Sequence, residues 1–397
     1  MSSAGGPVSS ARAFAAPLWS APFRPFYLLG SAYGVVVMLG WLALDAAGMV
    51  PPAGAASWNV WHGHELVFGF AGAIIAGILL TALPSWAGMK EIRGAGLAFL
   101  VAVWLAGRVA VWTSAWTPAW LVAAADCAAP LALAVLLTPR LLAVKQRLYL
   151  AALPPLYGLL AADVLFHLAL GLGLPGEAGY GLRAGVYAIV LLYVLKGGFL
   201  TPVFTGNRLR ERGRGEVGFS LPLEWAALLA ALAFLYTGLA PVPREAAAGA
   251  AFAAALVHGL RLARWQGWKV LDDPLLWPMH LGYAFLVLAL ALRGLADLGL
   301  AAPDAWLHAF TVGSLGLMMM ALMMRVSLRH TGRPLELPPL APLALAAALA
   351  AALLRLAAAF AVPDLLAAAA TAWAIAFLIY LWLFAAMLVS PSLPRRG

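Results

Sequence analysis

Long apolar runs alternate along the chain with short connections that carry proline, glycine or charged residues. Each run has about 20 residues or more, the length that an α-helix needs to cross the hydrocarbon core of a bilayer. The pattern therefore predicts an all-α polytopic membrane protein with 12 transmembrane helices. The predicted spans are residues 25–45, 60–83, 94–112, 118–137, 148–172, 183–205, 221–240, 245–263, 274–293, 304–326, 338–361 and 364–389.

Lysine and arginine gather at one side of the predicted bundle. Of the 25 basic residues, 19 lie in the two tails, where they include Arg12, Arg395 and Arg396, or at the connections that follow every second span. Cytoplasmic loops of membrane proteins carry such an excess, so we expect both termini to be cytoplasmic. The expected division is a short N-terminal tail (1–21), a single 12-helix transmembrane domain (22–390) and a C-terminal tail (391–397).

The composition agrees with this class of protein. With 64% hydrophobic and 10% charged residues, the chain cannot form the surface of a water-soluble protein. The net charge of +9 comes from short loops that anchor helices, so we expect a lipid bilayer as partner and no nucleic acid. Residues 1–21 lack the apolar run of a signal peptide.

The cysteine content limits the kinds of metal site that the chain can build. Cys127 is the only cysteine, which excludes a disulfide within the chain and any site made of several thiolates. A bound metal would therefore need histidine, methionine or carboxylate ligands. The sequence has seven histidines.

Four histidines are expected near the outer ends of their helices: His62 and His64 in the second span, His167 in the fifth and His308 in the tenth. His64 and His308 each lie 24 residues before a glycine at the inner end of their helix, Gly88 or Gly332, which places them at equal depth. Two imidazoles at one depth on facing helices can ligate a b-type haem from opposite sides.

His62 cannot join His64 at one ion, because side chains two residues apart on a helix point about 200° apart. We expect His64 and His308 to ligate haem and His62 to bind a second metal or a polar partner. The alternative is that the His62–His64 pair only forms hydrogen bonds at the membrane interface. His167 is interpreted as a core or interface residue.

Three further histidines, His258, His280 and His330, are expected near the inner side. Imidazole suits copper, and the methionines between Met318 and Met324 would favour its reduced form. The alternatives are that the three histidines are unrelated and that the methionines are flexible packing.

Basic residues within predicted spans need partners there. Arg108 in the third span and Lys196 in the sixth would neutralise haem propionates or pair with Asp126 and Asp163. Both interpretations remain open from the sequence.

Several separate motifs resemble those of the NnrS family of bacterial membrane proteins. The resemblance covers residues from Pro22 to about Pro334. It rests on the segments Pro22–Phe26, Trp61–Phe70, Leu275–Tyr283, His308–Gly313 and Arg325–Pro334.

The resemblance implies haem and copper in a multi-pass protein of the bacterial inner (cytoplasmic) membrane, associated with denitrification and nitric oxide stress. It does not imply which histidine binds which metal. The expected function is protection against nitric oxide at haem b and copper, with nitric oxide and a quinol or other electron donor as partners. The alternative is a secondary transporter of a small solute, because 12 helices with both termini inside fit that class equally well.

Overall fold

The computed structural model describes residues 14–52, 57–360 and 362–394. In these ranges all regular structure is helical, and 12 helical segments are long and apolar enough to cross a membrane. The predicted all-α class and the predicted number of spans are therefore confirmed, and the chain is a multi-pass membrane protein. Arg12, Arg395 and Arg396, which contributed to the predicted orientation, lie outside the described residues.

Ten spans consist of one α-helix each, and the second and tenth are interrupted by a π-helical segment. The single helices are α2 (Phe23–Ala46), α5 (Gly94–Trp112), α6 (Ala119–Ala143), α7 (Leu153–Gly171), α8 (Pro175–Glu211), α9 (Leu221–Leu239), α10 (Arg244–Arg264), α11 (Trp277–Asp297), α14 (Ala341–Phe360) and α15 (Leu365–Val389). The second span comprises α3 (Trp58–His64), π-helical Glu65–Ala71 and α4 (Gly72–Ala87). The tenth comprises α12 (Ala305–His308), π-helical Ala309–Leu315 and α13 (Gly316–His330).

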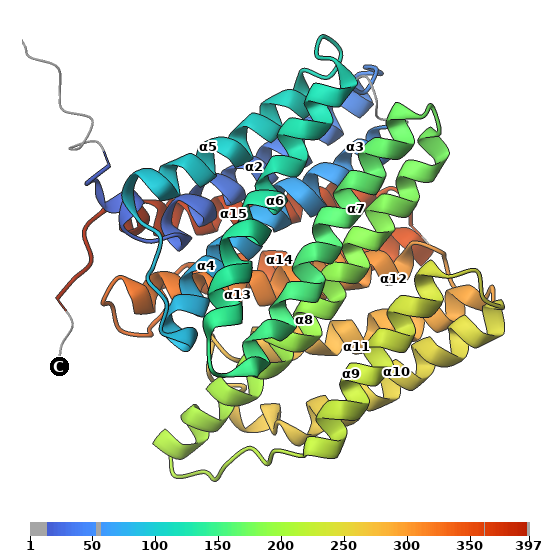
Figure 1. Cartoon of the computed structure of the whole chain (residues 1–397). Helices are drawn as coiled ribbons and strands as arrows, with labels where there is room; N and C mark the ends of the chain where they lie inside the picture. Colours follow the sequence, from blue (N-terminus) through green and yellow to red (C-terminus); the bar gives the residue numbers. More distant parts are fainter. Residues whose placement is uncertain (1–13, 53–56, 361, 395–397) are drawn as a thin grey trace, which may run out of the picture.

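The second, sixth and tenth spans form the centre of the bundle. Their buried shares are 78%, 72% and 78%, whereas no other span exceeds 56%. The remaining helices pack around them, mainly as sequential pairs such as α5 with α6 and α10 with α11 (Figure 1). Groups on the central spans are therefore shielded from lipid on most sides.

The sixth span is longer than its apolar run predicts. It was expected at residues 183–205, but α8 extends from Pro175 to Glu211. Gly88 and Gly332 have positive φ angles of 65° and 75° just after their helices, as expected for C-terminal glycines. Gly206 lies inside α8, and the helix continues beyond the apolar region.

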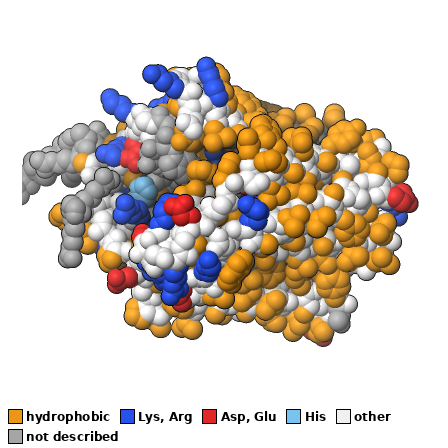
Figure 2. All heavy atoms as spheres, turned by 90° about the horizontal axis from the view of Figure 1, so that it is seen from below, with side chains coloured by type: hydrophobic (Ala, Val, Ile, Leu, Met, Phe, Trp, Pro, Cys, Tyr) orange, Lys and Arg blue, Asp and Glu red, His pale blue; other side chains and the backbone are white. Residues whose placement is uncertain are grey.

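The surface divides into an apolar side and a charged end. Figure 2 shows lysine and arginine side chains gathered at the end of the molecule near the described termini, while hydrophobic side chains cover the rest of that face. The first short helix, Pro17–Ser20, packs against α15, so both described ends of the chain lie together. This arrangement is compatible with the expectation that both termini share one side.

A buried arginine joins the first and last helices. Arg24 is 1% exposed, and its guanidinium donates to the carbonyls of Leu388 (2.8 Å) and Ser390 (2.7 Å) and to the hydroxyl of Ser392 (2.9 Å). Carbonyls in the last turn of a helix have no partner within the helix. Arg24 therefore caps α15 from another helix.

Replacing Arg24 by alanine is expected to lower the free energy of unfolding by roughly 2 kcal/mol, because the carbonyls at the end of α15 lose a charged donor. The measurement is thermal unfolding in detergent, followed by tryptophan fluorescence. Arg93→Ala is the matched control, since Arg93 is 66% exposed and pairs only locally with Glu91. Equal destabilisation by both variants would contradict the capping role.

Candidate functional site

His62 and His64 lie on one helix but belong to two different sites. His64 is the last residue of α3, and its ring packs against Phe166 on α7. His62 packs against Trp41 on α2 and lines a separate cavity. The prediction that the two side chains point to opposite sides of the helix is confirmed.

His64 is the centre of a buried polar cluster. Its Nδ1 lies 2.8 Å from Oε1 of Glu65, so a proton on Nδ1 is donated to that carboxylate. Its Nε2 lies 3.1 Å from Oδ2 of Asp126 and 3.4 Å from Oδ1 of Asp163. His64 is 1% exposed, and the three carboxylates show no exposed surface. The ring is therefore surrounded by acidic groups without access to bulk water.

Arg108 on α5 pairs with two of these carboxylates. Its Nη1 donates to Oε1 of Glu65 at 2.7 Å, and its Nη2 donates to Oδ1 of Asp126. Gly69 lies directly beneath the guanidinium, because a Cβ there would approach Nη1 to 2.9 Å. The alternative that Arg108 pairs within the bundle is confirmed, and its partners are Asp126, as expected, and Glu65, which was not expected.

His167 joins the cluster from α7, the helix that also carries Asp163. The two residues are four apart and therefore share one face of the helix. His167 Nε2 lies 2.9 Å from Oδ2 of Asp126 and 3.7 Å from Oδ1 of Asp163. His64, Asp126, Asp163 and His167 each offer one ligand atom within 4.8 Å of all the others.

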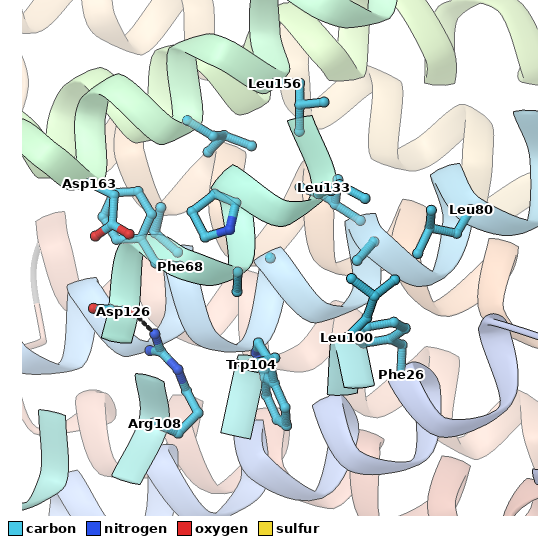
Figure 3. A pocket seen from close by; sticks show the side chains of 17 residues that line it. Phe26, Phe68, Leu80, Leu100, Trp104, Arg108, Asp126, Leu133, Leu156 and Asp163 are labelled. Atoms are coloured by element: carbon cyan, nitrogen blue, oxygen red, sulfur yellow. Dashed lines mark hydrogen bonds and ion pairs between the residues drawn. The ribbon is translucent and has the colours of Figure 1, made fainter. Parts of the chain in front are cut away.

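Two cavities border the cluster. One of about 220 Å³ is lined by His64 and His167 together with Pro52, Ser114 and Thr117, which belong to connecting loops. The other, of about 60 Å³, is apolar except at one end. Figure 3 shows Asp126 and Asp163 at that end, with Arg108 contacting Asp126. The cluster thus lies between a path from the loops and an apolar pocket in the bundle.

His62 and His308 line a third and larger cavity. Its volume is about 360 Å³, within the range of small-molecule sites. Its walls come from α2, α8, α14, α15 and the second and tenth spans. The Nδ1 atom of His62 is buried without a hydrogen-bond partner, and its ring centroid is 4.4 Å from that of Trp41.

A charged group lies beside His308 in this cavity. His308 Nδ1 donates to the carbonyl of Asp304 at 3.0 Å, which leaves Nε2 as the free nitrogen. Arg355 donates to Asp304 at 2.7 Å. Burial raises the pKa of Asp304, but the hydrogen bond from Arg355 and the positive charges nearby outweigh it and lower that pKa. Asp304 is therefore held as a carboxylate at neutral pH.

The structure does not bring His64 and His308 together. His64 lies in the cluster with Asp126, and His308 shares its cavity with His62. The two spans do match in register, because in each the π-helical segment begins directly after the histidine. Equal depth along the helices is thus consistent with the structure. The expectation that His64 faces His308 is corrected, because the histidine that shares a cavity with His308 is His62.

The three inner histidines lie in different surroundings. His258 Nδ1 is 2.8 Å from the hydroxyl of Tyr283, and His280 Nε2 donates to Thr205 at 2.8 Å. The ring of His330 packs against Phe23 at 5.8 Å. Among the described residues, these three histidines do not form a close-set group of metal-ligating atoms.

Lys196 lies elsewhere in the bundle. Its ammonium is 5.9 Å from the centroid of the Tyr149 ring, and it lines a small apolar pocket with Met318 and Met319. Arg108, His64 and His167 are among the side chains that contact Asp126 and Asp163. Arg108, His64 and His167 therefore engage the two aspartates that were expected as partners of Lys196.

Sequence reasoning found the parts of the cluster but not their assembly. Asp126 and Asp163 were expected only as charge partners, and His167 as a core residue. A usable signal was the spacing of Asp163 and His167, which places two potential ligands on one helix face. The approach of α6 to the same point depends on tertiary packing.

The cluster predicts unequal effects of two similar substitutions in protein stripped of metal ions by a chelator. Asp126→Asn is expected to lower the free energy of unfolding by roughly 3 kcal/mol, because Arg108 loses a buried charged partner. Asp163→Asn should cost clearly less, since Asp163 has no lysine or arginine within 4 Å among the described residues. Thermal unfolding of both variants measures this, and the reverse order would contradict the pairing described here.

The chain matches the sequence model of a known protein family. The sequence model of the family described as NnrS protein matches residues 17–392, nearly the whole chain. No curated protein compared with the chain matches it at a significant level.

Proposed function

This chain belongs to the NnrS family, and we propose that it protects bacteria against nitric oxide with a haem b held between His62 and His308. The observation that carries the proposal is the cavity of about 360 Å³ lined by both histidines at the centre of the bundle. We place the protein in the bacterial inner membrane with both termini in the cytoplasm, which the clustering of basic residues supports.

The side chains of the cavity suit a haem. His62 offers a buried nitrogen without a partner, and the hydrogen bond to Asp304 fixes the ring of His308 and leaves its Nε2 available. A second hydrogen bond of this kind orients histidine ligands in metal proteins. The remaining walls are mainly apolar, with Phe70, Val186 and Trp373 among them. Such walls accept a flat macrocycle and exclude water.

Arg355 supplies the charge that the acidic edge of a haem requires. It lines the cavity, and its present partner Asp304 is half exposed. A guanidinium binds carboxylates in a bidentate manner, so Arg355 can hold a propionate while remaining near Asp304. The roles expected for Arg108 and Lys196 toward propionates receive less support, since Arg108 is engaged by Glu65 and Asp126.

A bound haem would supply an iron that can exchange electrons. The residues of this chain contribute the two ligands, their orientation and an apolar environment. Nitric oxide is small and uncharged, so the apolar walls and the surrounding lipid favour its entry. A quinol or another electron donor is the expected source of electrons.

Copper is the second cofactor that the family resemblance implies. The separate surroundings of His258, His280 and His330 give no support to one copper site at these residues. The close-set group is instead the one at His64, and its ligand properties are considered in the next subsection.

The haem proposal predicts the effect of single histidine substitutions. His62→Ala or His308→Ala should abolish the low-spin haem spectrum of the purified protein, because each removes one axial ligand. His64→Ala should retain it. The pigment should be extracted by acid acetone, since the chain has a single cysteine and cannot attach haem through Cys-x-x-Cys-His.

Two results would overturn this assignment. Loss of haem in His64→Ala together with retention in His62→Ala would restore the pair expected from the sequence, His64 and His308. A folded protein with no Soret band would favour the alternative class, a transporter.

The protective function predicts a phenotype in cells. A strain lacking the gene should grow more slowly than its parent under a nitric oxide donor, and the wild-type gene should restore growth. His62→Ala should fail to restore it, whereas His280→Ala, which alters a buried histidine outside the cavity, should succeed. Equal growth of the parent and the deletion strain at all doses would refute the proposed role.

A further inference from the structure

The cluster around His64 contains more negative than positive charge. The cluster holds three carboxylates, of Glu65, Asp126 and Asp163, and one guanidinium, of Arg108, and all four side chains are at most 4% exposed. Charges inside a membrane protein are costly unless they are neutralised. Two further positive charges are needed to balance these groups when all are ionised.

We propose that His64, Asp126, Asp163 and His167 bind one divalent transition-metal ion. The four ligand atoms come from three separate parts of the fold: α3, α6, and one face of α7. The ion would supply the two missing positive charges. None of these residues lines the cavity of His62 and His308, so this site is independent of the proposed haem.

The distances between the ligand atoms match a small coordination shell. Tetrahedral ligands at about 2.0–2.1 Å from a metal lie roughly 3.3 Å from one another. In the cluster, Nε2 of His64 is 3.1 Å from Asp126 and 3.4 Å from Asp163. Nε2 of His167 is 2.9 Å from Asp126 and 3.7 Å from Asp163. Four histidine–carboxylate separations thus fall close to the expected value.

Glu65 orients His64 as a metal ligand. When the neutral ring of His64 donates from Nδ1 to Glu65, its lone pair is on Nε2, which faces two carboxylate oxygens. Lone pairs that face each other at this distance repel unless a proton or a metal ion lies between them. A carboxylate that accepts from the far nitrogen of a histidine is a common support of metal-bound imidazole.

Asp163 provides an independent indication of a ligand. Its Oδ2 is buried and has no hydrogen-bond partner, although the residue shows no exposed surface. Buried carboxylate oxygens are normally paired. The cavity of about 220 Å³ reaches His64 and His167 from the loop residues Pro52, Ser114 and Thr117, and so offers an entry path.

The donor set selects the class of ion. Two imidazoles and two carboxylates suit Zn²⁺, Fe²⁺ or Cu²⁺. Ca²⁺ prefers six to eight oxygen ligands, and Mg²⁺ prefers octahedral oxygen. Cu⁺ favours thiolate and thioether, neither of which is among the four ligands.

The experiment uses the full-length protein in detergent, stripped with a chelator, loaded with Zn²⁺ and desalted. Mass spectrometry of the metal content should give one Zn²⁺ per chain for the wild type. His167→Ala and Asp163→Asn should lose it. Glu65→Gln should keep the site but weaken Zn²⁺ binding about 10- to 100-fold, because it weakens the support of His64 without removing any of the four ligands. His280→Ala is the matched control and should bind as the wild type does.

Loading with Co²⁺ gives a second readout, since four-coordinate Co²⁺ with these ligands should show strong visible absorption. If the variants fail to fold, the wild type alone still provides a test, because bound Zn²⁺ should raise the unfolding temperature of the wild type. The proposal would be overturned if the wild type bound no Zn²⁺, or if Asp163→Asn and His167→Ala bound as much Zn²⁺ as the wild type. The cluster would then be a network neutralised by protons. The Soret band of the purified protein reports separately on the haem proposal.

Discussion

The neutralisation of buried charge is the constraint on which the centre of this bundle depends. Glu65, Arg108 and Asp126 come from three different spans, and none of them reaches water. Each would be costly alone inside the membrane, so the three helices must approach one another at this point. The contact of Arg108 with both carboxylates fixes α5 and α6 against the second span more specifically than apolar packing can.

The second span separates two chemically different environments. On one side His64 faces carboxylates and a guanidinium, and on the other His62 faces an apolar cavity bordered by Trp41 and His308. The separation follows from the angle between side chains two residues apart on a helix. One short segment of backbone therefore positions ligands for both sites and holds the distance between them constant.

The sequence predicted the spans well because apolar length and flanking charge determine them. Residues 94–112 coincide with α5, whereas α8 extends further because its polar ends remain helical outside the apolar run. Counting residues from Gly88 and Gly332 gave depth along the helix axis, but depth contains no information on rotation about that axis. The residue that shares a cavity with His308 is therefore His62 and not His64, and the convergence of Asp126 and Asp163 on His64 depended on packing that the sequence pattern does not encode.

The two π-helical segments have a consequence for how sequences of this kind are aligned. Each segment contains more residues per turn than an α-helix, so one residue is in excess relative to a regular helix. Deleting one residue between Glu65 and Ala71 would therefore leave a regular α-helix that keeps His62 and His64 near their present faces. A relative without the π-helical segment would thus be one residue shorter here and would still present both histidines to the same two sites. An alignment that places no gap there would compare residues that occupy different sites.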